Sequence, residues 1–301
     1  MKNFLKKIQY WTVGAMLLLF SLHSVTLFAQ GGKSSKNAEK TPVIRILAIG
    51  NSFSEDAVEE YLYGLAKAAG HRVIIGNLYI GGAPLSLHLK NAQGDLPAYE
   101  YRKVGLDGKK ARFANTSLSK ALADEAWDYI SVQQASPNSG QFDTYLEPLP
   151  PLMAYVRERA SNPKVKYIWH QTWAYAQNST HSGFVNYDKD QLKMYAAIAD
   201  ASRRAMKLGH FDLLVPAGTA IQNARTSFIG DNMNRDGYHL DLNKGRYTAS
   251  CAWFEVLFKQ DVRQNSYRPE KVSAREAEVA QAAAHAARQK PYQISDLKQY
   301  H

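Results

Sequence analysis

Five short apolar runs alternate with longer segments of helical spacing, and this alternation limits the possible folds more than any other feature of the chain. Residues 43–49, 72–78, 128–133, 165–169 and 211–215 are largely apolar and contain many β-branched side chains, as strands buried on both faces require. Strands separated by helix-length segments imply right-handed crossovers and a parallel sheet. The sequence therefore predicts the α/β class, as a three-layer α/β/α sandwich with about five parallel strands.

The segments between the strands predict helices over residues 55–69, 118–126, 151–160, 188–208, 243–258 and 273–287. The clearest is 188–208, where Asp188 and Gln191 have capping-box spacing and Leu192 and Tyr195 share an apolar face. The polar residues 90–116 predict a long excursion that covers or rims a site. In such sheets, sites lie at the carboxyl ends of the strands.

The N-terminal residues predict export. A basic start precedes an apolar run and the small residue Ala29, so we interpret residues 1–29 as a signal peptide, 30–41 as a solvated linker and 42–301 as one domain that includes the C-terminal helices. An uncleaved membrane anchor is the alternative. After cleavage, we expect no membrane association and a periplasmic or secreted bacterial protein.

Charge and cysteine content limit the partners. The formal charge is +10, which loss of Lys2, Lys6 and Lys7 would lower to +7, and the basic residues form no dense cluster. We therefore expect no nucleic acid partner. The one cysteine, Cys251, lies in an apolar run, which predicts a buried helix and excludes an intramolecular disulfide. No cysteine and histidine spacing predicts a metal site, and we expect no cofactor.

Ser52 follows the first predicted strand directly, in the segment Gly50-Asn51-Ser52-Phe53-Ser54. A serine there lies at the carboxyl end of the sheet and at a helix amino terminus, whose free N–H groups favour negative charge. Its hydroxyl could attack a carbonyl carbon while its own N–H holds the oxyanion. Helix capping by Ser52 or Ser54 is the competing interpretation.

Asp236 and His239 form an Asp-x-x-His pair far downstream. A carboxylate that holds the Nδ1 proton of an imidazole makes the ring an effective base. Taken alone, the pair is more typical of a surface turn than of a catalytic site. Its occurrence together with a serine at the end of the first strand favours a catalytic role.

These segments resemble those of the SGNH or GDSL-like hydrolases, and the resemblance extends over roughly residues 43–258. It implies a flavodoxin-like SGNH hydrolase fold, a triad of Ser52, Asp236 and His239, and an oxyanion site formed by the N–H groups of Ser52 and Gly82. The usual asparagine of the third block is absent, so the resemblance assigns its role to Gln133, with Asn138 as the alternative. Details such as residues 81–85 and 170–175 are more similar to an exported bacterial subgroup of unassigned function.

His170, Trp173 and Tyr175 follow the fourth predicted strand, where aromatic side chains bind substrate or simply pack beneath a loop. The sequence thus predicts a serine esterase that removes ester groups, O-acetyl groups above all, from a small-molecule or polysaccharide substrate. The alternatives are a non-catalytic glycan-binding protein on the same scaffold and an acyltransferase with the same triad.

Overall fold

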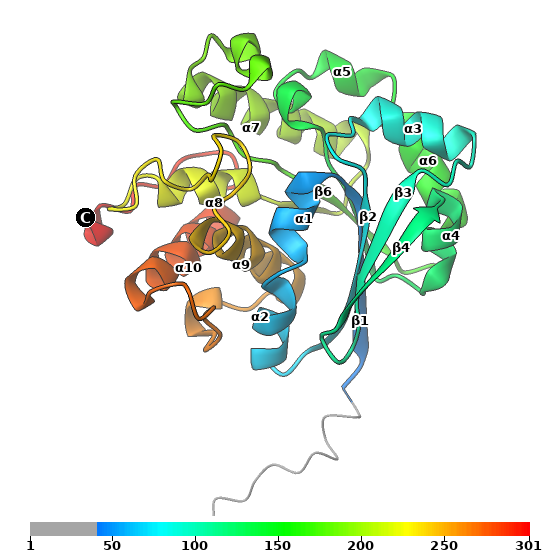
Figure 1. Ribbon diagram of the computed structural model, residues 1–301, viewed down its shortest axis with the longest axis horizontal. Coiled ribbons are helices and arrows are strands. Elements are labelled where there is room, and N and C mark those ends of the chain that lie inside the picture. The colour runs from blue at the N-terminus through cyan, green and yellow to red at the C-terminus, as the bar shows by residue number, and fades with distance from the viewer. Residues whose placement is uncertain (1–40) are drawn as a thin grey trace, which may run out of the picture. The chain divides into compact units, whose positions relative to one another are not determined.

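The computed structural model describes residues 41–301 (Figure 1). The predicted signal peptide, 1–29, and all but the last residue of the predicted linker, 30–41, lie outside the described residues. Within the described part, no helix is both long enough and apolar enough to cross a membrane. A seven-stranded sheet in the order β4-β3-β2-β1-β5-β6-β7 forms the centre of the molecule.

Five strands of the sheet run parallel, which confirms the predicted number. They are β1 (Val43–Gly50), β2 (Arg72–Tyr79), β5 (Tyr129–Val132), β6 (Lys166–His170) and β7 (Leu213–Val215). β1 lies between β2 and β5, and every neighbouring pair among the five is parallel. Their carboxyl ends therefore meet at one edge of the sheet, with the end of β1 near the middle of that edge.

The remaining two strands correct the interpretation of residues 90–116 as an excursion over the site. After α3 (Leu85–Gln93), β3 (Tyr99–Val104) and β4 (Lys110–Thr116) form an antiparallel hairpin that extends the sheet beside β2. Six of the seven residues of β4 are exposed because it is the edge strand. The polar composition therefore reflects an exposed sheet edge.

The side chains of β1 explain the layered architecture, because they alternate between two cores. Ile46 and Ala48 pack with one set of helices, and Leu47 and Ile49 pack with the other. The first set is α1 (Ser52–Val58), α2 (Leu62–Ala68), α8 (Ala217–Ala224), α9 (Lys244–Phe258) and α10 (Ala274–Gln289) (Figure 1). The second is α3 with α4 (Leu118–Asp124), α5 (Asp143–Leu146), α6 (Leu149–Arg159) and part of α7 (Gln191–Leu208). Cys251 is buried in α9, as predicted.

Two helix predictions need correction. Residues 55–69 form two helices, α1 and α2, because Glu59 turns inward between them, where its carboxylate bonds Asn77 and Arg102. The N-cap of α7 is Asp190, which accepts the N–H of Lys193 at 2.9 Å.

Asp188, the predicted cap of α7, has φ of +55° and ends the preceding 3-10 helix, Ser182–Tyr187. Leu192, predicted to share a face with Tyr195, is 57% exposed because the buried face runs through Gln191, Met194, Tyr195 and Ile198.

Candidate active site

Ser52 lies at the junction of β1 and α1, as predicted. Asn51 caps the helix, since its side-chain oxygen accepts the N–H of Phe53 at 3.0 Å. The hydroxyl oxygen of Ser54 lies 2.8 Å from the carbonyl oxygen of Asn51 and 2.8 Å from Oδ1 of Asn77, and its one hydrogen is donated between these two acceptors. Capping, the competing role for the two serines, is thus performed by Asn51, and Ser52 lines an open pocket.

Asp236 and His239 are in direct contact. Oδ2 of Asp236 lies 2.7 Å from Nδ1 of His239, and Oδ1 accepts the N–H groups of Tyr238 at 3.2 Å and His239 at 2.8 Å. Burial raises the pKa of Asp236, but the hydrogen bonds from the ring and from the two backbone groups outweigh it and hold the pKa below its ordinary value. The ionised carboxylate requires the ring proton at Nδ1, which leaves Nε2 as the basic nitrogen.

Gly237 makes this turn possible. Its φ is +89°, in the left-handed region, and a Cβ built on it would lie 2.9 Å from the hydroxyl oxygen and 3.0 Å from Cα of Ser179. Its carbonyl accepts the N–H of Ala176 at 2.8 Å. The segment after β6 therefore packs directly against the turn that presents His239.

Asp56 ties the same turn to the helix that begins with Ser52. Its carboxylate is fully buried and accepts the N–H of Leu240 at 2.8 Å, Nε of Arg246 at 2.7 Å and Nη1 of Arg235 at 3.2 Å. Leu240 directly follows His239, and Asp56 lies one helical turn after Ser52. This buried cluster links two segments about 180 residues apart at the place where a triad needs them together.

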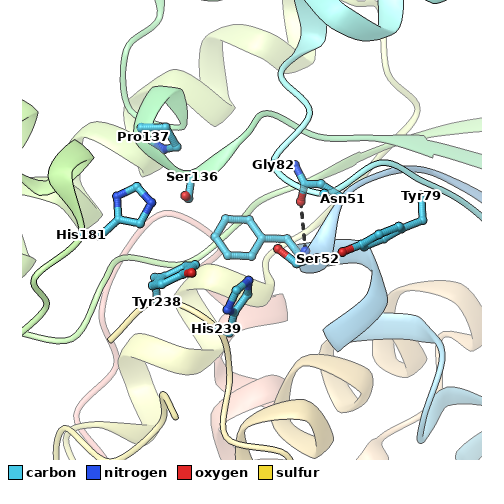
Figure 2. A pocket seen from close by; sticks show the side chains of 11 residues that line it. Asn51, Ser52, Tyr79, Gly82, Ser136, Pro137, His181, Tyr238 and His239 are labelled. Atoms are coloured by element: carbon cyan, nitrogen blue, oxygen red, sulfur yellow. Dashed lines mark hydrogen bonds between the residues drawn. The ribbon is translucent and has the colours of Figure 1, made fainter. Parts of the chain in front are cut away.

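The pocket at this edge has a volume of about 360 Å³ and contains both Ser52 and His239 (Figure 2). In this view Ser136, His181 and Tyr238 lie toward one end of the pocket and Tyr79 toward the other, with Ser52 and His239 between them. The complete lining is Asn51, Ser52, Phe53, Tyr79, Gly81, Gly82, Ser136, Pro137, His181, Tyr238 and His239. A serine hydroxyl and an imidazole oriented by a carboxylate thus line one solvent-accessible space.

Gly82 lines the pocket, as expected for an oxyanion donor. Its φ is +64°, which favours glycine, and no atom lies within 4 Å of the position of a Cβ. Within residues 41–301, neither its N–H nor that of Ser52 donates to a protein acceptor. Nδ2 of Asn51 donates to the carbonyl of Ala83 at 3.0 Å, which joins the loop of Gly82 to the turn of Ser52. Two free N–H groups are therefore held at the pocket by one buried side chain.

Gln133 is not brought to the pocket. It is buried behind Asn51, to whose Oδ1 its amide nitrogen donates at 2.8 Å, and its oxygen lies 2.7 Å from Nδ1 of His170. Asn138, the alternative, ends the 3-10 helix Ser136–Asn138 and does not line the pocket either. Gln133 thus contacts the residue that caps the helix beginning at Ser52, and Ser136 is the residue of this segment that reaches the pocket.

His170, Trp173 and Tyr175 pack behind the lining, as the competing interpretation of these aromatic residues expected. Complete burial lowers the pKa of His170 to about 3, so its ring is neutral. The ring of Trp173 lies 4.3 Å from that of Phe53, and its Nε1 donates to the carbonyl of Tyr238 at 2.8 Å. These side chains support residues of the pocket wall from behind and do not line the pocket.

One cluster within residues 41–301 has the composition of a cation site, away from this lining. Ligand atoms of Glu255, Asp261 and His285 lie within 4.8 Å of one another. Both carboxylates already pair with guanidinium groups, Glu255 with Arg288 at 2.9 Å and Asp261 with Arg263 at 2.6 Å. A metal ion would have to displace these cations, so the cluster is accounted for by ion pairing.

The model of a protein family described as a domain of unknown function, DUF4886, matches residues 45–287. The chain belongs to the DUF4886 family. A crystal structure of a DUF4886 protein from Bacteroides uniformis is similar to it, with 53% sequence identity and a TM-score of 0.85, and the match covers 86% of this chain and 100% of that one.

More distant structures are also similar to this DUF4886 domain. A protein from Slackia heliotrinireducens, provisionally described as an SGNH hydrolase, has 22% identity and a TM-score of 0.50 over 72% of this chain and 100% of that one. A provisionally described GDSL-like lipase from Parabacteroides merdae has 15% identity and a TM-score of 0.49 over 71% and 95%. A comparison with curated proteins finds no match. The DUF4886 domain therefore has the SGNH hydrolase fold, which confirms the resemblance inferred from sequence.

Sequence reasoning missed four polar residues of the DUF4886 pocket. Tyr79, Ser136 and Tyr238 each lie within three residues of a residue that the resemblance assigned to the site, namely Gly82, Gln133 and His239, so these neighbours were a usable signal. His181 lies in the long connection between β6 and α7, and nothing in the local sequence distinguishes it. Only the folded chain places it beside Tyr238, with ring centroids 4.8 Å apart.

Proposed function

We propose that this protein is a serine esterase whose triad is Ser52, His239 and Asp236. The observation that carries the proposal is that Ser52 lines the same pocket as a histidine whose Nδ1 is engaged by a carboxylate at 2.7 Å. The free Nε2 is then the atom that can accept the serine proton. The SGNH hydrolase fold supports the proposal as a scaffold.

In this mechanism Nε2 of His239 accepts the proton of Ser52 as the serine oxygen attacks the ester carbonyl carbon. The tetrahedral intermediate then expels the alcohol, which takes its proton from His239, and an acyl-serine forms. Water attacks that acyl group and gives a proton to His239, which returns it to Ser52 as the acid leaves. Asp236 stays ionised throughout and stabilises the imidazolium that forms twice in the cycle.

We assign the oxyanion contacts to the backbone N–H groups of Ser52 and Gly82. Preorganised donors of this kind are each worth about 3 kcal/mol of transition-state stabilisation. Gln133 contributes in this proposal by fixing Asn51, which holds the two donor segments together.

We further propose that the ester is an O-acetyl group on a carbohydrate and that the protein acts outside the cytoplasm. The pocket accommodates a small acyl group with part of its alcohol, and its lining combines aromatic rings, Tyr79 and Tyr238, with hydrogen-bonding groups. The signal-like composition of residues 1–29 supports a periplasmic or secreted location.

The test is the hydrolysis of p-nitrophenyl acetate by purified wild type and Ser52→Ala. We expect the substitution to lower kcat by a factor on the order of 1000 or more, because it removes the hydroxyl that forms the acyl-enzyme in this mechanism. Ser182→Ala is the matched control, since Ser182 is exposed and does not line the pocket. Equal turnover by wild type and Ser52→Ala would disprove the proposal.

A non-catalytic glycan-binding protein is the second candidate, favoured by the position of Gln133 outside the pocket. In that case wild type would bind acetylated xylooligosaccharides without releasing acetate, and the affinity would survive His239→Ala. Acetate release that is lost in His239→Ala would favour the esterase.

A further inference from the structure

Ser136 and His181 lie side by side at one end of the pocket and belong to neither the triad nor the oxyanion donors (Figure 2). Ser136 begins the 3-10 helix after β5, and His181 caps the 3-10 helix that precedes α7. Two segments about 45 residues apart thus each contribute one polar side chain to the same part of the wall. The hydrogen bonds behind them determine what these side chains offer to a ligand.

Tyr175 lies behind both residues and joins them. It is fully buried, its hydroxyl donates to Oγ of Ser136 at 2.7 Å, and the same hydroxyl lies 3.1 Å from Nδ1 of His181. A tyrosine hydroxyl has one hydrogen, which here is donated to Ser136, so the oxygen of Ser136 is the acceptor in that bond. Ser136 therefore uses acceptor capacity toward Tyr175, behind the pocket wall, and His181 contacts the same hydroxyl oxygen.

The tautomer of His181 follows from a second contact. Its Nδ1 accepts the backbone N–H of Gly183 at 3.0 Å, and a nitrogen that accepts a hydrogen bond carries no proton. The neutral ring must then have its hydrogen on Nε2. Burial, the largest effect, and the nearby His239 lower the pKa of His181, while Asp236 opposes them, so the ring is neutral near pH 7.

Ser136 is left with its own hydrogen. Its hydroxyl oxygen accepts from Tyr175, and within residues 41–301 that hydroxyl donates to no protein acceptor. Two uncharged hydrogen-bond donors therefore line the pocket, the O–H of Ser136 and the Nε2–H of His181. The ring of Tyr238 lies beside them, with its centroid 4.8 Å from that of His181 and 4.1 Å from that of His239.

We propose that Ser136 and His181 form a donor pair that binds an oxygen of the alcohol part of the ester, and that Tyr175 positions this pair. The inference rests on the proposed esterase function and specifies its substrate class. The leaving alcohol takes its proton from His239, and Tyr238 connects His239 to His181 on that side of Ser52. An aromatic face beside uncharged donors matches a sugar, which has C–H faces and hydroxyl oxygens.

The test compares two acetate esters that differ in the alcohol. p-Nitrophenyl acetate has no hydroxyl on its leaving group, whereas acetylated xylobiose has several. We expect Ser136→Ala and His181→Phe each to lower kcat/KM for acetylated xylobiose about ten-fold more than for p-nitrophenyl acetate, mainly through KM, because each removes one hydrogen bond. Ser136→Thr keeps the hydroxyl and should restore most of the difference. Tyr175→Phe should also lower kcat/KM more for acetylated xylobiose than for p-nitrophenyl acetate, but by a smaller factor than Ser136→Ala or His181→Phe. Equal effects on the two esters would overturn the proposal.

A binding measurement separates this proposal from the esterase proposal. Ser52→Ala protein is titrated with acetylated xylobiose and followed by NMR, alone and combined with His181→Phe. Affinity that falls about ten-fold with the second substitution supports the donor pair even if wild type hydrolyses neither ester, in which case only the esterase proposal fails. Absent binding, or binding that His181→Phe leaves unchanged, overturns the donor pair.

Discussion

Replacement of Asp56 by asparagine tests whether a buried carboxylate positions His239. Oδ2 accepts the N–H of Leu240 at 2.8 Å, and Oδ1 accepts Nε of Arg246 at 2.7 Å. Whichever way the new amide is turned, its NH2 group faces one of these donors. The substitution also leaves Arg246 with weaker partners, Glu60 at 3.6 Å and Glu55 at 4.0 Å.

The magnitude follows from these contacts. Breaking a buried ion pair by removal of one partner costs about 3–5 kcal/mol, and since the amide keeps one acceptor, we expect about 3 kcal/mol of lost stability for Asp56→Asn. Leu240 directly follows His239, so its release shifts the imidazole relative to Ser52. A misplacement of about 1 Å costs about 100-fold in rate, which we expect in kcat, with KM little changed.

The assay combines urea unfolding, kcat on p-nitrophenyl acetate and the pH titration of the His239 ring by NMR. Glu60→Gln is the matched control, because Glu60 contacts Arg246 at 3.6 Å and Lys110 at 2.6 Å but not the turn of His239. That control should cost less than about 1 kcal/mol and leave the ring titration unchanged. If folded Asp56→Asn has the wild-type kcat and the wild-type His239 titration, the positioning argument is wrong.

Two further predictions concern single positions. Burial lowers the pKa of His88 to about 4, so between pH 6.5 and pH 4 the unfolded chain binds a proton at this residue while the folded chain does not. The free energy of unfolding should therefore fall by roughly 3 kcal/mol from this residue as the pH is lowered through that window. Urea unfolding of His88→Gln at pH 7 and pH 4.5 should show a smaller loss of stability than wild type. Gly82→Ala and Gly70→Ala both place an alanine at positive φ, +64° and +78°, with open space at the position of the Cβ. Each should therefore lower the free energy of unfolding, measured by thermal unfolding, by about 1 kcal/mol, but only Gly82→Ala should also lower kcat. Equal kcat in both variants would remove Gly82 from the oxyanion site.

Some features of the fold were predictable because short-range patterns report them directly. An apolar strand such as residues 43–49 can bury both of its faces only between two layers of helices, and the side chains of β1 do alternate between two cores. The spacing of Asp236 and His239 allows a local turn, which the structure shows as a 2.7 Å contact. The predicted helix boundaries at 55–69 and 188 were wrong because burial of Glu59 and the cap at Asp190 outweighed local propensity.

Other features depend on contacts between segments far apart in the chain. The polar residues 110–116 read as a loop, yet they form the exposed edge strand of a hairpin that is stabilised by pairing with β3. Gln133 was a reasonable oxyanion donor from its place after β5, but Asn51 and His170 hold its amide behind the pocket. Such outcomes depend on which hydrogen-bonding partner lies nearest in space, and the local sequence does not contain that information.

By itself, the sequence determined the α/β class, the parallel direction of about five strands and the place of Ser52 at the end of the first of them, because periodicity and strand-to-helix alternation are properties of neighbouring residues. Only the tertiary structure decided that Asp56 joins the turn of His239 to the helix of Ser52 and that Tyr175 directs Ser136 and His181 toward the pocket. The physical reason is that a buried polar group must find its partners wherever the fold brings them, at any distance along the chain.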